Sequence, residues 1–139
     1  MTQTEIQDFV ASLEGVQRED NMGYLFYFVG DSHVIPFVSI AESDNEYDRL
    51  SQLDREGIFR VNIGVSKQTF DALFSDTKQK DLTDYSALDV FMPHPDYAKQ
   101  FFICILNPSK KNEALTKKFI TEAYTLAKDR LERVSSKTA

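Results

Sequence analysis

The sequence predicts an α+β fold: a single domain with a mainly antiparallel β-sheet, and an N-terminal helix and a long C-terminal helix packed on one face of it. Three observations support this prediction. Runs rich in aromatic and β-branched residues, typical of strands, recur at 24–29, 34–40, 58–65 and 101–106. Helical periodicity is strongest near the two ends of the chain. Strands and helices alternate too seldom for a doubly wound parallel sheet.

The size and composition of the chain suit one hydrophobic core. Its 139 residues fit a single domain, which we assign to 1–139 with a frayed tail at about 135–139. The 42% hydrophobic and 12% aromatic content supplies enough apolar surface to fold, which excludes global disorder.

The first element is predicted to be a helix over about 5–14. Thr4 has the position of an N-cap, with Gln7 three residues later in capping-box spacing. Gly15 tolerates the left-handed conformation that ends helices. The apolar face is formed at i, i+3, i+4 and i+7 by Ile6, Phe9, Val10 and Leu13.

A β-hairpin is predicted next, from strands at 24–29 and 34–40 joined by a turn at 30–32. Pro36 has no N–H to donate, so the second strand is expected to be an edge strand or to kink there. An edge strand is able to pair across a two-fold axis, and this is the basis for expecting a homodimer.

The run at 58–65 alternates in polarity and predicts a strand with two different faces. The core face would carry the apolar residues Phe59, Val61, Ile63 and Val65. Arg60, Asn62 and Gly64 would share the other, polar face. Ser66 then has the position of a cap for a short helix, and 75–84 is predicted to be a solvated loop.

The last two elements are a buried strand and a long helix. Residues 101–106 form an unbroken apolar run, which predicts a central strand buried on both faces. Cys104 lies inside that run, so we interpret it as a structural cysteine rather than a nucleophile. Helical spacing of apolar residues over about 112–134 predicts a helix that crosses the sheet.

Charge is unevenly distributed and bears on partners and location. The net charge of −6 divides into −10 for residues 1–109 and +4 for 110–139. An acidic body repels phosphate backbones, which argues against nucleic acid as a partner. The acidic N-terminus, the lack of an apolar stretch of about 18 residues and the single cysteine predict a cytoplasmic protein with no membrane contact.

Several segments resemble known bacterial sequences. The segments at 13–16 (LEGV), 37–40 (FVSI) and 119–131 (FITEAYTLAKDRL) resemble the MmcQ/YjbR-like family of small bacterial proteins. Those at 45–66 and 91–109 resemble more closely a related bacterial family of unknown function. The resemblance implies a CyaY-like or double-wing fold, with helices on one side of an antiparallel sheet. The DNA-binding role suggested for MmcQ/YjbR-like proteins rests on fold analogy, and the acidic body here departs from it.

Arg60 and Asn62 are the first candidate ligand-binding residues. Both project from one face of a predicted strand, and an arginine fork matches the geometry of a carboxylate. This pattern predicts a site for a small anionic ligand. The alternative is that the face is exposed, or that Arg60 forms an ion pair with Asp48 or Asp54.

His94 and Tyr97 are the second candidates, in a proline-stiffened segment before the 101–106 strand. His94 lies two residues before Asp96, and a histidine beside a carboxylate can act as a base or a ligand. The alternative is a loop histidine bonded to backbone. The complete candidate ligand-binding set is Arg60, Asn62, His94, Tyr97 and Asp48, with the 44–56 loop as rim.

No metal, cofactor or catalytic residue is predicted. Asp44, Glu46 and Asp48 alternate like the start of a calcium loop, but Arg49 and Arg55 occupy the sixth and twelfth positions, where such a loop needs Gly and Glu. Phosphate-binding glycine loops, nucleophile elbows, CxxC pairs and HExxH motifs are absent from the sequence.

Three functions therefore stay open at this stage. The first is a non-catalytic binding or interaction module, with a homodimer as one form. The second is a receptor or enzyme for a small anionic molecule, whose pocket gathers the residues above. The third is nucleic-acid binding through the basic C-terminal helix.

Overall fold

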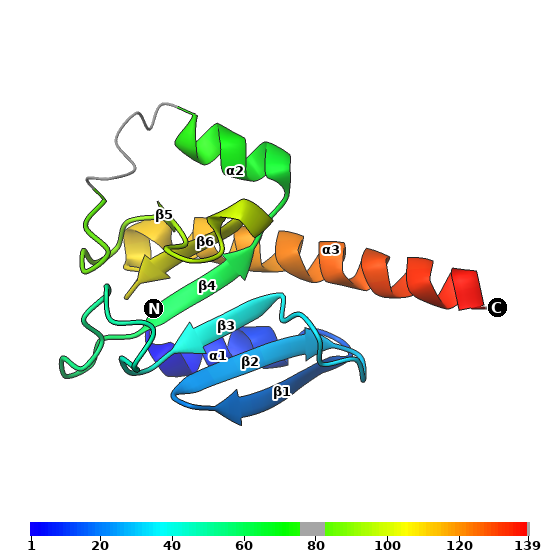
Figure 1. The fold of residues 1–139 in the computed structure, drawn as a ribbon, viewed down its shortest axis with the longest axis horizontal. Coiled ribbons are helices and arrows are strands. Elements are labelled where there is room, and N and C mark those ends of the chain that lie inside the picture. The colour runs from blue at the N-terminus through cyan, green and yellow to red at the C-terminus, as the bar shows by residue number, and fades with distance from the viewer. Residues whose placement is uncertain (76–82, 139) are drawn as a thin grey trace.

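Six strands form one antiparallel sheet in the order β1-β2-β3-β4-β6-β5 (Figure 1). The computed structural model describes residues 1–75 and 83–138, with side chains in the last helix described up to residue 133. The sheet and its flanking helices confirm the predicted α+β domain. The elements are α1 (Gln3–Ala11), β1 (Val16–Asn21), β2 (Tyr24–Val29), β3 (Val38–Ala41), β4 (Arg60–Gly64), α2 (Lys67–Phe74), β5 (Met92–Pro93), β6 (Phe102–Leu106) and α3 (Glu113–Thr138), with 3₁₀ turns at Ala98–Gln100 and Lys110–Asn112.

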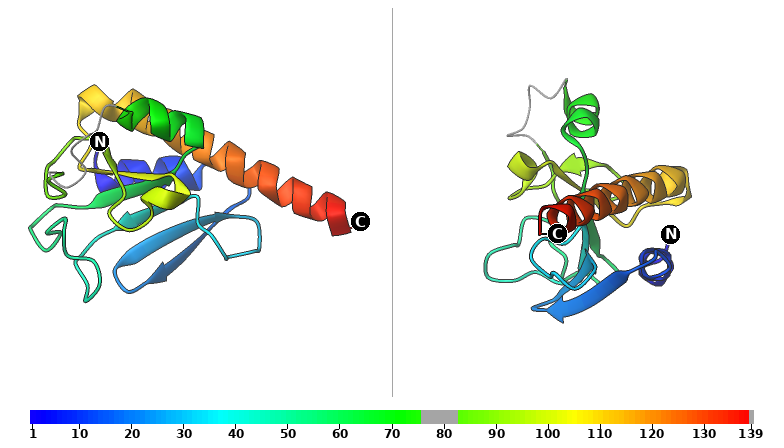
Figure 2. Two further views of the ribbon diagram at one scale, coloured as in Figure 1. Left: turned by 45° about the horizontal axis from the view of Figure 1, so that its top comes forward. Right: turned by 90° about the vertical axis from the view of Figure 1, so that its right-hand side faces the viewer.

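The two terminal helices cover the same face of the sheet, as predicted (Figure 2). α1 contributes Ile6 and Val10 to the main core, and α3 contributes Phe119, Ile120 and Ala123, all buried. These side chains pack on the alternate strand residues that point toward the helices. The opposite face of the sheet carries no helix from this pair. Among the described helices, none has the length and apolarity needed to cross a membrane.

The N-terminal helix begins earlier than the sequence prediction. Thr2 is the N-cap and forms a capping box with Glu5, so the predicted pairing of Thr4 with Gln7 is wrong. The capping-box spacing was correct but was placed two residues too late, because Thr2 and Glu5 have the same spacing as Thr4 and Gln7. The helix ends at Ala11 rather than at about residue 14.

The first hairpin is formed by two strands of which only one was predicted. β1 pairs with β2 through a two-residue turn in which Met22 and Gly23 both have positive φ, the conformation that favours tight hairpins. The predicted 34–40 strand begins only at Val38, after Pro36. β3 then pairs with β2 on one side and β4 on the other, so the prediction of an edge strand at Pro36 is wrong.

The later strands lie close to their predicted positions. β4 falls within 58–65, and β6 begins at Phe102 because Phe101 has a left-handed φ of 63° that turns the chain into the strand. β6 is buried between β4 and β5, with Cys104 fully buried. Ser66 caps α2 as predicted. Most of the predicted 75–84 loop, residues 76–82, lies outside the described residues, and α3 continues to Thr138.

The strand register defines the face of the sheet that α1 and α3 leave uncovered. Cα pairing aligns Phe26 with Ser39, Ser39 with Asn62 and Asn62 with Cys104. Side chains directly opposite each other on neighbouring strands point to the same side of a sheet. Because Val61 and Ile63 on β4 belong to the helix-covered core, Asn62 and its partners point to the other side.

Candidate functional site

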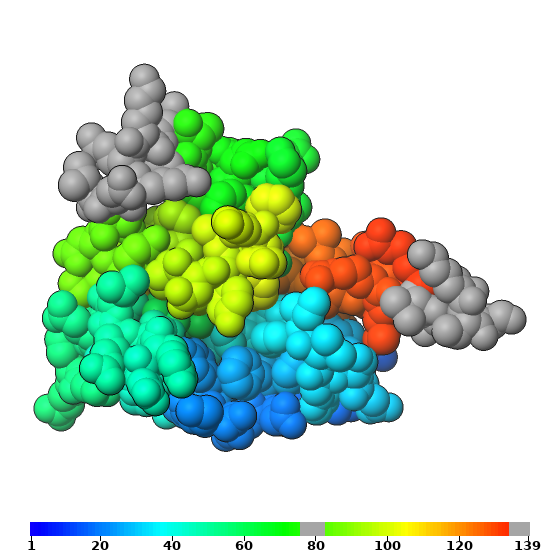
Figure 3. Space-filling model, viewed as in Figure 1, coloured from blue at the N-terminus to red at the C-terminus, as the bar shows by residue number. Residues whose placement is uncertain are grey.

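A cavity of about 640 Å³ lies over this second face of the sheet. Four segments far apart in the sequence border it and come together on the face seen in Figure 3: the β1–β2 hairpin, the 30–37 loop, the 42–57 loop and the 94–102 segment. A volume of this size is typical of small-molecule sites, which range from about 300 to 1,000 Å³. The cavity is therefore the candidate functional site.

A buried ion pair supports the cavity floor: its carboxylate, Asp48, lines the cavity, and its guanidinium, Arg60, does not. Arg60, on β4, is completely buried, and its Nη1 and Nη2 atoms donate to the two carboxylate oxygens of Asp48 at 3.0 and 2.5 Å. Nη1 also donates to Ser51 at 3.0 Å, and Nε donates to Asn62 at 2.9 Å. The guanidinium is thus occupied by protein groups, and its charge is balanced by that of Asp48.

The carboxylate of Asp48 is held ionised by its neighbours. Burial alone would raise its pKa, but hydrogen bonds from Arg60 and Tyr24 outweigh burial and lower the pKa below the usual value. Tyr24 Oη donates to Asp48 at 2.5 Å and accepts from Asn45 at 3.0 Å. Burial and the bond to Asp48 raise the pKa of Tyr24 to about 12, so this phenol stays protonated.

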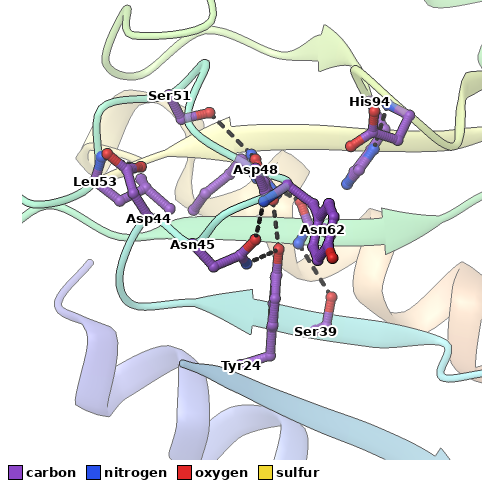
Figure 4. A network of polar contacts seen from close by, with 12 residues as sticks. Tyr24, Ser39, Asp44, Asn45, Asp48, Ser51, Leu53, Asn62 and His94 are labelled. Carbon is purple, nitrogen blue, oxygen red and sulfur yellow. Dashed lines mark hydrogen bonds and ion pairs between the residues drawn. The ribbon is translucent and has the colours of Figure 1, made fainter. Parts of the chain in front are cut away.

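Asn62 and Ser39 bring two polar side chains to the floor of the cavity. Asn62 Oδ1 accepts from Arg60, which fixes the amide orientation, and Asn62 Nδ2 donates to Ser39 Oγ at 3.1 Å (Figure 4). Both residues are buried and both line the cavity. An amide nitrogen carries two hydrogens and a hydroxyl carries one. Among the described residues, one hydrogen of Asn62 Nδ2 and that of Ser39 Oγ have no acceptor.

His94 lines the cavity on the side of β5, and its ring orientation is fixed by backbone. Its Nδ1 accepts from the N–H groups of Asp96 and Tyr97 at 3.0 and 3.1 Å. Because Nδ1 is an acceptor, the proton of the neutral ring lies on Nε2. Burial and the charge of Arg60 lower the pKa of His94 to about 3, so the ring is neutral at ordinary pH. His94 is only 4% exposed, and no described residue accepts from its Nε2–H.

Aromatic rings form two walls of the cavity. Tyr24 and Phe26 stack with ring centroids 5.3 Å apart on the β2 side. Tyr97 and Phe102 stand 6.3 Å apart on the other side, with the His94 ring 5.0 Å from that of Tyr97. Gly64 makes room for this wall, because a Cβ at Gly64 would lie 2.9 Å from the Phe102 ring.

The structure brings four of the five sequence-predicted site residues to the cavity. Asp48, Asn62, His94 and Tyr97 line it, with Tyr97 at the exposed mouth. Arg60 is beneath the floor and forms the ion pair with Asp48 that the sequence left as an alternative. Its guanidinium supports the floor and does not reach the lining.

Sequence reasoning missed the residues that complete the lining. Ser39, Tyr24 and Phe26 lie on strands that looked purely structural, and their relevance follows only from the register that aligns them with Asn62. The alternation within 24–29 did contain a signal, since Tyr24 and Phe26 must share one face of a strand. Without the pairing to the neighbouring strand, the sequence could not show to which side of the sheet that face points.

The acidic loop and the cysteine have structural roles. Asp44 accepts from the N–H of Leu53, and Asp54 accepts from the N–H of Asp44, so both carboxylates bind the loop itself. Within the described residues, no cluster of three metal-binding side chains forms. Burial raises the pKa of the Cys104 thiol to about 12, which makes it a poor nucleophile.

The fold and the site together define the class: a single α+β domain with a small-molecule-sized cavity on the open face of an antiparallel sheet. The chain belongs to a family of unknown function, DUF6194, whose model matches residues 1–136. This confirms the prediction of an uncharacterised family. No curated protein and no solved structure shows significant similarity to the chain.

Proposed function

We propose that this protein is a binding protein for a small, largely planar molecule that enters the cavity between the 42–57 loop and the 94–102 segment. One observation carries the proposal. The cavity combines aromatic walls with a floor of buried polar groups, and its His94 Nε2–H has no protein acceptor among the described residues. A donor that reaches a concave lining and has no protein acceptor is positioned to bond a ligand that supplies one.

The rim of the cavity adds support. Single exposed apolar side chains are ordinary on protein surfaces, but a cluster around a concavity is typical of binding sites. Five large hydrophobic residues that are more than half exposed line this cavity, and they come from four separate segments: Met22, Val34, Ile35, Tyr47 and Tyr97.

The chemistry of the floor favours binding over catalysis. The ion pair of Arg60 and Asp48 occupies both charged groups, and the lowered pKa of His94 keeps the ring from acting as a base near neutral pH. Cys104 is buried and protonated. No nucleophile with an adjacent base is assembled among the described residues that line the cavity, so we propose a receptor or carrier rather than an enzyme.

The remaining expectations from the sequence stay as proposals. A cytoplasmic location, a homodimer and the MmcQ/YjbR-like assignment are each compatible with the α+β fold. The homodimer no longer draws support from Pro36, because β3 is paired on both sides. Nucleic-acid binding by α3 draws support only from its charge, and Lys117 of that helix is placed over the Phe9 ring, 5.5 Å from its centroid.

A direct test uses 2-naphthamide, a planar molecule with one carbonyl, as the probe in isothermal titration calorimetry. Binding to the wild type is expected, and Ser39→Leu should abolish it by filling the floor. Ser75→Leu is the matched control, because Ser75 is exposed at the end of α2, outside the cavity lining. Equal binding to wild type and Ser39→Leu would show that the probe does not use this cavity.

A further inference from the structure

Three uncharged side chains on the cavity floor can each donate a hydrogen bond to a ligand. His94 offers Nε2–H, Asn62 offers the second hydrogen of Nδ2, and Ser39 offers its hydroxyl hydrogen. The acceptors on the same floor each take at least one hydrogen bond from a protein group. Both oxygens of Asp48 accept from Arg60, and Asn62 Oδ1 accepts from Arg60 as well. The free donor hydrogens on this floor therefore favour a ligand that accepts hydrogen bonds.

No free positive charge lies on the floor to balance an anion. Arg60 is bound to Asp48 and does not line the cavity, and His94 is neutral. Moving a carboxylate or phosphate out of water without a balancing cation is costly. A carbonyl oxygen has no charge to desolvate, and its two lone pairs can accept from two of the three donors.

We infer that the ligand binds through an uncharged acceptor, such as an amide, lactam or ketone carbonyl, that takes hydrogen bonds from His94 Nε2–H and the Asn62 amide. This inference rests on the proposed function and names the ligand class for the same cavity. It replaces the carboxylate expected from Arg60 with a neutral planar carbonyl compound. Aromatic rings on both sides suit such a molecule, because Tyr24 and Phe26 face the cavity opposite Phe102.

One cation does line the cavity, and the test has to separate its effect from that of the floor. Arg130 lies on α3 and is exposed, so it belongs to the mouth. Its charge is able to attract an anion to the rim without involving the floor, although Asp96 also lines the mouth and carries the opposite charge. Arg130→Gln removes this contribution and leaves the floor intact.

His94→Asn is the most informative variant of the floor. An asparagine oxygen accepts readily from the N–H two residues later, so Asn at position 94 can replace Nδ1 as the acceptor for Asp96. The shorter side chain removes Nε2–H from the cavity. Urea unfolding at pH 7 checks that the variant is folded before its affinity is measured.

The experiment measures the affinities of 2-naphthamide, 2-naphthoate and naphthalene at pH 7 for the wild type, His94→Asn and Arg130→Gln. In the wild type, 2-naphthamide should bind at least about 10-fold more tightly than 2-naphthoate. His94→Asn should lower the affinity for 2-naphthamide by about 3- to 10-fold, the range for one hydrogen bond, and leave the affinity for naphthalene unchanged. Arg130→Gln should leave the affinity for 2-naphthamide unchanged.

The outcomes separate failure of the neutral-acceptor inference from failure of the proposed binding function. If 2-naphthoate binds as tightly as 2-naphthamide to both the wild type and Arg130→Gln, the inference of a neutral acceptor is overturned while the cavity remains a binding site. Equal affinity of 2-naphthamide for wild type and His94→Asn also overturns the inference. If none of the three probes binds the wild type, the proposed function itself fails.

Discussion

The buried neutral histidine predicts a specific pH dependence of stability. The pKa of His94 is about 3 in the folded protein, whereas an unfolded histidine has a pKa of about 6.5. At pH 8 both states are neutral at this ring. As the pH falls below about 6.5 the unfolded chain binds a proton that the folded chain does not, so the free energy of unfolding decreases.

The size of the effect follows from the two pKa values. Each unit by which the pH falls between about 6.5 and the folded pKa lowers the free energy of unfolding by about 1.4 kcal/mol. At pH 5, about 1.5 units below the unfolded value, the loss is about 2 kcal/mol relative to pH 8. For a domain whose total stability is about 5–15 kcal/mol, this is readily measured.

Urea unfolding at pH 5, 6, 7 and 8, followed by circular dichroism, tests this value. The comparison is between the wild type and His94→Asn, which retains all other titrating groups. The difference in unfolding free energy between the two proteins should change by about 2 kcal/mol from pH 8 to pH 5. His33→Asn is the matched control, because it also replaces a histidine by asparagine, in the 30–37 loop outside the cavity lining. Parallel curves of unfolding free energy against pH for the wild type and His94→Asn would refute the reasoning.

Three further predictions concern the floor, the wall and the cysteine. Asp48→Asn should lower the free energy of unfolding by about 3–5 kcal/mol in urea titrations, because it leaves the charge of Arg60 buried and unpaired; a double variant with Arg60→Met should recover part of that loss. Gly64→Ala should displace the Phe102 ring and weaken the binding of 2-naphthamide several-fold in calorimetry. The free energy of unfolding measured in urea should change by less than about 1.5 kcal/mol. At pH 8 the thiol of Cys104 should react with a disulfide reagent about 10³-fold more slowly in the native protein than in urea, because its pKa of about 12 leaves little thiolate; equal rates would contradict its burial.

The fold could be predicted largely from periodicity. Alternation at 58–65, the apolar run ending at Leu106 and helical spacing in the last segment each identify an element that the structure contains. β1 could not be predicted in this way, because five of its six residues are exposed and polar (Gln17–Asn21), with no apolar alternation. The tight turn at Met22–Gly23 was the available signal for this hairpin.

The candidate site could be predicted only in part, and for a physical reason. Arg60 and Asn62 were identified because alternation on one strand fixes which residues share a face. Whether that face is exposed, buried or part of a cavity depends on the loops that cover it. The 42–57 loop buries Arg60 by supplying Asp48 and Ser51, and only tertiary structure reveals that contact.

The state of His94 depends on similar non-local facts. The sequence placed it beside Asp96 and left two interpretations, a base or ligand and, as the favoured one, a loop histidine bonded to backbone. In the structure the side chain of His94 accepts from the backbone N–H of Asp96, and burial keeps the ring neutral. His94 therefore accepts from backbone through Nδ1, and its Nε2–H is left as a hydrogen-bond donor.

The central claim is that the neutral ring of His94 presents Nε2–H to a ligand in the cavity, and side-chain nitrogen NMR of ¹⁵N-histidine-labelled protein tests it most directly. The account predicts that at pH 6 one histidine shows a neutral ring with the proton on Nε2, and that this resonance shifts when 2-naphthamide is added. That signal should be absent from His94→Asn. A His94 ring that is charged at pH 6, that carries its proton on Nδ1, or that does not respond to bound 2-naphthamide would contradict the account.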